Sequence, residues 1–194
     1  MLTLNSPRPM AFATVSLLVA ALSGPNGLTA QGVRGGADSV RVRIAGVEWL
    51  AGQDSGGDAP VVEIRVAIEH AADFHSWPDE PVVPAELKGL NPIATSIDLI
   101  SAPDGVVVES IDWPDPVTVT VRYTSEPLDL LSFADTTIAR LRVGLPADLD
   151  LERGQDVSSP GERIELRVQF QSCDEEYCYP PRREKLLVPL AVDR

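Results

Sequence analysis

The chain has only two cysteines, Cys173 and Cys178, and four residues separate them. Thiols this close can form a disulfide, share a metal ion with further ligands, or stay reduced inside a core. A metal site needs more ligands, and the only two histidines, His70 and His75, form no recognisable metal-binding spacing with the cysteines. A disulfide between Cys173 and Cys178 is therefore the favoured chemistry.

Such a bridge has either a structural or a redox role, and the spacing alone leaves both open. A loop of about six residues gains only ~2 kcal/mol from the cross-link, whereas a bridge across a whole domain gains ~4 kcal/mol or more. The short loop therefore favours a bridge kept for chemistry. Three carboxylates, Asp174–Glu176, lie inside the loop and disfavour a thiolate. A thiol with a raised pKa is a poor leaving group, which favours a dithiol that donates electrons.

The elements that must position the cysteines show an alternation of period two. In Val117–Tyr123, the clearest example, valines occupy one face while threonines and an arginine occupy the other. Side chains alternate between the two faces of a strand, so this pattern predicts sheets with one dry and one wet face. The other predicted strands are Val40–Ile44, Val62–Ile68, Ser96–Ile100, Val106–Ile111, Ile138–Leu145, Ile164–Phe170 and Lys185–Val192.

Turn signals rich in Gly, Pro, Asp and Ser separate these segments, and no helical period is evident after residue 38. Seven or eight short strands predict an all-β fold, an immunoglobulin-like antiparallel β-sandwich, with a small barrel as the second choice. Hydrophobic residues make up 44% of the chain, which is enough for a core. The formal charge is −13 and no dense basic patch exists, which argues against nucleic acid as a partner.

The first 30 residues have the pattern of a cleavable signal peptide. Arg8 supplies the positive start, and Met10–Leu22 is a nearly unbroken apolar run, too short to span a bilayer comfortably. Small residues precede a cleavage site after Ala30, with an earlier site after Ser23 as a second choice, and an uncleaved anchor helix is the alternative. We expect residues 31–38 to form a flexible leader. Residues 39–194 then form the domain, exported without stable membrane insertion to a compartment that permits disulfides.

The stretch around the cysteines, VQFQSCDEEYCYPPRREKLLVPL, resembles the active-site hairpin in the family of the N-terminal (alpha) domain of the bacterial thiol:disulfide interchange protein DsbD. The shared features are an aromatic–Gln pair, a short acidic loop between the cysteines, a hydrophobic residue and Pro-Pro after the second cysteine, and a strand ending in VPL. The segments EHAADFHSW and IDWPDP also resemble this family, so the resemblance covers residues 40–192. The best-known members have five residues between the cysteines, and this chain has four.

The resemblance implies an immunoglobulin-like domain in which Cys173 and Cys178 are the catalytic pair, with Cys178 exposed to attack. It also implies a cap loop over the pair, which we expect at residues 122–127 with Tyr123 as the covering aromatic. His75, whose ordinary pKa lies near neutrality, is either a proton acceptor beside a thiol or a packed side chain. The remaining side chains expected around the pair are Phe74, Trp77, Tyr177 and Tyr179.

The resemblance further implies a periplasmic or secreted domain that relays electrons through the cysteine pair without a cofactor. Its expected partners are thioredoxin-like exported proteins, including those of cytochrome c maturation, or a membrane disulfide reductase. If the domain is an enzyme, it is a thiol:disulfide interchange oxidoreductase, and we expect a monomer. The rival hypothesis is a non-catalytic immunoglobulin-like binding module with a structural disulfide.

Overall fold

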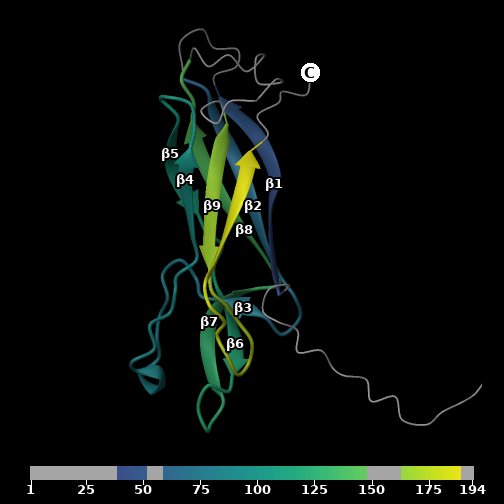
Figure 1. Cartoon of the computed structure of the whole chain (residues 1–194), viewed down its shortest axis with the longest axis vertical. Helices are drawn as coiled ribbons and strands as arrows, with labels where there is room; N and C mark the ends of the chain where they lie inside the picture. The colour runs from purple at the N-terminus through teal and green to yellow at the C-terminus, as the bar shows by residue number, and fades with distance from the viewer. Residues whose placement is uncertain (1–38, 52–58, 148–162, 189–194) are drawn as a thin grey trace, which may run out of the picture. The chain divides into compact units, whose positions relative to one another are not determined.

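The structure, a computed structural model, describes residues 39–51, 59–147 and 163–188 (Figure 1). The predicted signal peptide, residues 1–30, and the predicted leader, residues 31–38, lie outside these ranges and stay predictions. In the described ranges, no helix combines the length and the apolarity that a membrane crossing requires.

The first sheet has four antiparallel strands in the order β1-β2-β8-β5. Their bounds are Val40–Ala51 for β1, Val61–His70 for β2, Thr136–Gly144 for β8 and Val107–Asp112 for β5. Strand β2 lies inside this sheet, and its side chains alternate between buried and half-buried over most of its length. The period-two pattern of the sequence is therefore the pattern of burial.

The second sheet has three antiparallel strands in the order β11-β9-β4. Their bounds are Arg182–Val188 for β11, Ile164–Phe170 for β9 and Ser96–Ser101 for β4. Numbered along the chain, the seven strands of the two sheets have the 1-2-5-4 and 3-6-7 order of a constant-type immunoglobulin domain. The prediction of an immunoglobulin-like antiparallel β-sandwich is confirmed.

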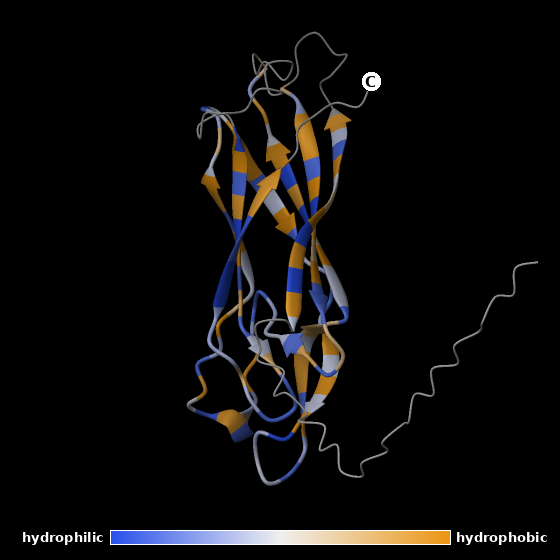
Figure 2. Ribbon diagram, turned by 45° about the vertical axis from the view of Figure 1, so that its right-hand side comes forward, coloured by the Kyte–Doolittle hydropathy of each residue, from blue (hydrophilic) through white to orange (hydrophobic). Residues whose placement is uncertain are grey.

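One hydrophobic core joins the two sheets, with side chains supplied by β2 and β8 on one side and β9 on the other. Each fully buried Val, Leu, Ile or Phe contributes about 1.5–3 kcal/mol relative to an exposed one. Figure 2 shows the alternation of hydrophobic and hydrophilic residues along the long strands. Within this core, the residues with 0% exposure are Val62, Ile64, Val66, Ile68, Ala139, Leu141, Val143, Ile164, Leu166, Val168 and Phe170.

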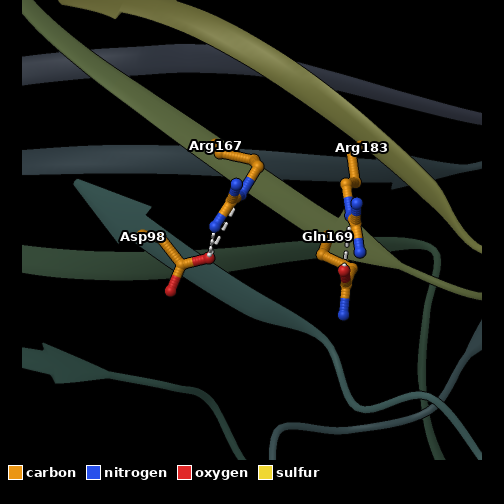
Figure 3. A network of polar contacts seen from close by, with 4 residues as sticks. All are labelled: Asp98, Arg167, Gln169 and Arg183. Carbon is orange, nitrogen blue, oxygen red and sulfur yellow. Dashed lines mark hydrogen bonds and ion pairs between the residues drawn. The ribbon is translucent and has the colours of Figure 1, made fainter. Parts of the chain in front are cut away.

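The outward face of the second sheet carries polar cross-strand pairs (Figure 3). Arg167 on β9 forms an ion pair of 2.9 Å with its register partner Asp98 on β4. Arg183 on β11 donates from Nε to the Gln169 side-chain oxygen at 2.8 Å, again between register partners. Exposed pairs of this kind contribute little to stability, about 0–1 kcal/mol each, but they favour the observed register.

Three insertions between the sandwich strands build a further sheet in the order β10-β3-β7-β6. Consecutive strands of the sandwich run in opposite directions, so every second connection lies at the same end of the sandwich. The insertions follow β2, β5 and β9, which places them together (Figure 1). The bounds are Ser172–Cys173 for β10, His75–Ser76 for β3, Leu128–Ala134 for β7 and Val117–Val121 for β6.

The structure differs from the sequence-based predictions in several elements. Strand β1 continues beyond Ile44 to Ala51, strand β7 was not expected, and the predicted strand Val117–Tyr123 ends at Val121. A short 3-10 helix, η2, spans Ala85–Leu87. The last predicted strand, Lys185–Val192, corresponds to β11, and its residues beyond 188 lie outside the described ranges.

Candidate functional site

Cys173 and Cys178 lie directly opposite each other on a tight antiparallel hairpin between β9 and β11, and a disulfide joins them. Asp174 N–H donates to the Tyr177 carbonyl at 2.9 Å, and Tyr179 N–H donates to the Ser172 carbonyl at 2.8 Å. These two bonds flank the cysteines, which therefore form a non-hydrogen-bonded pair, the closer of the two antiparallel pairings. Their Cα atoms are 4.0 Å apart, so the hairpin itself brings the two sulfurs together.

The tip of this hairpin is organised by the carboxylate of Asp174. Its Oδ1 accepts from the backbone N–H groups of Glu176 at 2.8 Å and Tyr177 at 2.7 Å, and its Oδ2 accepts from the Tyr179 hydroxyl at 2.7 Å. Burial acts to raise the pKa of Asp174, but these hydrogen bonds outweigh it and hold the pKa below its usual value. Asp174 is therefore an ionised turn former.

The loop between β6 and β7, residues 122–127, lies against the hairpin. Its backbone contact is the Arg122 N–H, which donates to the Glu175 carbonyl at 2.6 Å. The Tyr123 hydroxyl lies 3.0 Å from the Asp174 carbonyl, 3.2 Å from His75 Nε2 and 3.5 Å from Cys178 Sγ. The loop and the aromatic residue expected at the cysteine pair thus lie beside the disulfide.

His75 on β3 lies on the inner side of this site. It is the register partner of Cys173 on one side and of Ala134 on the other, and only 1% of its surface is exposed. Burial, with a smaller contribution from the neighbouring His70, lowers the pKa of His75 to about 4, although the Asp174 carboxylate acts in the opposite direction. The imidazole is therefore neutral at pH 7, which argues against a positively charged histidine beside the thiols.

The other residues predicted at the site are not all equally close to the disulfide. Trp77 is buried in a hydrophobic cluster that also contains Cys173, with Cys178 packed against it. The rings of Phe74 and Tyr179 are 6.1 Å apart, so Phe74 supports the hairpin from its side. Tyr177 points to solvent and is 65% exposed, so it is placed at the surface of the tip and not over the sulfurs.

The two sulfurs differ in access. Cys173 is fully buried, whereas Cys178 is half-buried and has the Tyr123 hydroxyl beside its sulfur. Attack by an external thiolate on a disulfide requires a path to one sulfur. Of the two cysteines, Cys178 is therefore the less buried residue, and Cys173 lies entirely inside the cluster.

Sequence reasoning missed the polar residues that hold the hairpin base. The Gln171 side chain accepts from the Ile93 N–H and donates to the Tyr179 carbonyl, both at 3.1 Å. The Ser39 and Ser172 hydroxyls form a buried hydrogen bond of 2.7 Å. Gln171 belongs to the aromatic–Gln pair seen in the sequence, but the serine bond joins segments far apart in the chain and has no local signal.

A second missed group surrounds His70, at the end of β2. Its Nδ1 lies 3.2 Å from the Asp135 carbonyl and its Nε2 lies 2.9 Å from the Ser76 hydroxyl. Burial lowers the pKa of His70 to about 4, although the Asp135 carbonyl and carboxylate act to raise it. In the described ranges, no group of three His, Cys, Asp or Glu side chains is arranged to hold a metal ion.

The chain was compared with family models, with curated proteins and with solved structures. No family model matches the chain, and no curated protein matches it. The structure search found the crystal structure of the N-terminal periplasmic domain of ScsB from Proteus mirabilis, 12% identical with a TM-score of 0.42. The match covers 73% of this chain and 50% of that chain, so the present chain spans about half of that structure.

Proposed function

We propose that this chain is an exported thiol–disulfide exchange domain that relays electrons through Cys173 and Cys178 between thioredoxin-like partners. The observation that carries the proposal is the place of the disulfide. It crosses the tip of the β9–β11 hairpin, in a small cluster of its own, and takes no part in the core between the two sheets.

A structural role explains this placement poorly. In antibody domains the structural disulfide crosses the core from the second to the sixth strand, which correspond to β2 and β9 here. The inward residues of β2 and β9 are aliphatic or, at Phe170, aromatic. A hairpin bridge that closes about six residues contributes only ~2 kcal/mol, about half of what a cross-core bridge gives. The bond is therefore dispensable for holding the sandwich together.

The exchange proceeds in two balanced steps. A thiolate of a reduced partner attacks Cys178 Sγ, the Cys173–Cys178 bond breaks, and Cys173 leaves as a thiolate that takes up a proton. The partner's second thiolate then attacks the partner sulfur of the mixed disulfide, so Cys178 leaves as a thiolate, which afterwards takes up the second proton. Two electrons and two protons pass to this chain, and the partner becomes a disulfide. The reverse sequence reduces a downstream disulfide.

The loop of residues 122–127 must move for the first step, because Tyr123 lies beside the sulfur that is attacked. We assign it the role of a cap. The electrons travel in the sulfurs themselves, so the mechanism uses no cofactor. A membrane disulfide reductase or a thioredoxin-like protein, including one of cytochrome c maturation, supplies or receives them in the periplasm or outside the cell.

A trapping experiment tests the proposal. In Cys173→Ala, the half-buried Cys178 keeps its thiol, so this variant should be trapped as a mixed disulfide with a thioredoxin-fold protein whose own second cysteine is replaced by alanine, because neither chain then has a second thiolate to break the bond. The matched variant Cys178→Ala keeps only the buried thiol and should trap far less. The wild-type disulfide should also equilibrate with a thioredoxin redox couple. A bridge that no thioredoxin-like dithiol reduces, together with no trapped partner, would overturn the relay.

A further inference from the structure

The Tyr123 hydroxyl has one hydrogen to donate and three neighbours within hydrogen-bond distance, namely the Asp174 carbonyl, His75 Nε2 and Cys178 Sγ. The Asp174 carbonyl can only accept, and a disulfide sulfur carries no hydrogen. With the disulfide closed, the hydroxyl therefore donates toward the carbonyl, at 3.0 Å, and its oxygen is free to accept from the imidazole.

The unpaired ring nitrogen of His75 indicates which of its two nitrogens carries the hydrogen, and so whether the imidazole donates to the Tyr123 hydroxyl or accepts from it. In the described part of the chain, His75 Nδ1 is buried without a hydrogen-bond partner. A neutral imidazole has one N–H, and a buried N–H without an acceptor costs more than a buried lone pair without a donor. The hydrogen therefore belongs on Nε2, which donates to the Tyr123 oxygen at 3.2 Å. Tyr123 then keeps its own hydrogen for a second acceptor.

We propose that the Tyr123 hydroxyl is the hydrogen-bond donor to the Cys178 thiolate, and that His75 is the positioning residue that holds the hydroxyl for it. The inference deepens the proposed function and rests on it, since the thiolate forms only when the disulfide is exchanged. When the second partner thiolate releases Cys178, the new anion at 3.5 Å is a stronger acceptor than the Asp174 carbonyl. The O–H turns toward the sulfur, and no proton leaves the tyrosine.

The surrounding groups keep both members of this pair in the required form. Burial, and then the Asp174 carboxylate, raises the pKa of Tyr123, so the hydroxyl keeps its proton at any working pH. The imidazole is neutral at pH 7, because burial and the nearby His70 lower its pKa to about 4 against the pull of Asp174. Arg122 and Glu175 pair with each other at the exposed edge of the site, and the remaining carboxylate of the tip, that of Glu176, is on an exposed residue.

The test uses the full chain with Cys173→Ala, so that Cys178 is the only thiol. Its pKa is read from the pH dependence of alkylation by iodoacetamide and from thiolate absorbance. Adding Tyr123→Phe, which keeps the ring, should raise the pKa of Cys178 by about one unit, the effect of one hydrogen bond to a charged acceptor. His75→Leu should also raise the pKa of Cys178. His75→Gln, which retains an N–H donor, should raise it less than His75→Leu does.

The matched control is Tyr177→Phe, a change on the exposed tip that should leave the pKa of Cys178 where it was. An unchanged or lowered pKa in Tyr123→Phe would overturn the inference, because a residue that merely covers the sulfur raises its pKa. If a variant does not fold, the unmutated tyrosine still reports, since its ring carbon beside the hydroxyl should show an NMR shift that follows the Cys178 titration. If the NMR shift of this Tyr123 ring carbon does not change as Cys178 titrates, the hydrogen bond between them is refuted as well. None of these measurements needs a redox partner. They can therefore refute the role of Tyr123 while the proposed relay still holds, and the trapping experiment can refute the relay while the hydrogen bond from Tyr123 still holds.

Discussion

Reduction of the Cys173–Cys178 disulfide should lower the free energy of unfolding of this chain by only about 2 kcal/mol. The bond closes a loop of six residues, because the cysteines are 5 apart in sequence, and the chain-entropy relation gives ~2 kcal/mol for a loop of that size. The core between the sheets contains neither sulfur. The measurement is urea unfolding, followed by far-UV circular dichroism, of the oxidised and the reduced protein at one pH.

The double variant Cys173→Ser/Cys178→Ser is the control for incomplete reduction, and it should unfold close to the reduced protein. The dependence of the unfolding free energy on urea should change little, since the same apolar surface becomes exposed. Amide NMR shifts on reduction should be confined to the hairpin, the loop of residues 122–127 and β3. A loss of 4 kcal/mol or more, or shifts spread through β2 and β9, would show that the bridge holds the sandwich and would refute the reasoning.

The other predictions concern the core, the histidines and the hairpin tip. Leu166→Ala, at a position with 0% exposure, should cost about 2–5 kcal/mol in urea unfolding, whereas Leu187→Ala, 54% exposed, should stay within about 0.5 kcal/mol. The pKa values of His70 and His75 fall from 6.5 to about 4 on folding, so the unfolded chain binds more protons between these values. The free energy of unfolding should therefore contain the full contribution of these two histidines above pH 6.5 and should fall as the pH is lowered toward 4. The variant His70→Gln should show a smaller fall over the same pH range. Asp174→Ala removes two turn hydrogen bonds and should speed amide hydrogen exchange at the tip, with Asp174→Asn intermediate.

Local alternation predicted the strands in which a run of apolar residues occupies the inward positions, and it failed where something interrupts that run. Strand β1 was expected to end at Ile44 because the register shifts between Ile44 and Gly46, a β-bulge that moves Val47 and Trp49 out of phase with the first half. Strand β7 was missed because Ser132, a polar residue, is fully buried in it. Both cases are set by pairing with other strands, which a single window of sequence does not contain.

The candidate site was predictable in part for a similar reason. The hairpin and its disulfide follow from residues close in sequence, and the position of Tyr123 came from a family resemblance. The contacts of His70 with Ser76 and Asp135, and of Ser39 with Ser172, join distant segments and have no local pattern. They follow only once the strand order is known, because that order puts the insertions after β2, β5 and β9 at one end.

The proposed exchange requires the loop of residues 122–127, proposed as a cap, to move, and the contacts that hold the site indicate what that movement costs. At its base, short buried side chains are hydrogen-bonded, as between Thr95 and the Trp77 carbonyl at 2.5 Å. The cap is held more weakly, by the Arg122 N–H, the Tyr123 hydroxyl and an Arg122–Glu175 ion pair of 3.7 Å with both side chains more than half exposed. Each such hydrogen bond contributes about 1 kcal/mol, and the exposed pair contributes less than that. Breaking these polar contacts costs about 2–3 kcal/mol, and the packing of Tyr123 against the hydrophobic cluster around the disulfide adds to that cost, so at most about 3% of molecules are open at any time. In the proposed exchange, these are the molecules in which a partner would reach Cys178, while the core between the two sheets, which contains neither sulfur, stays closed.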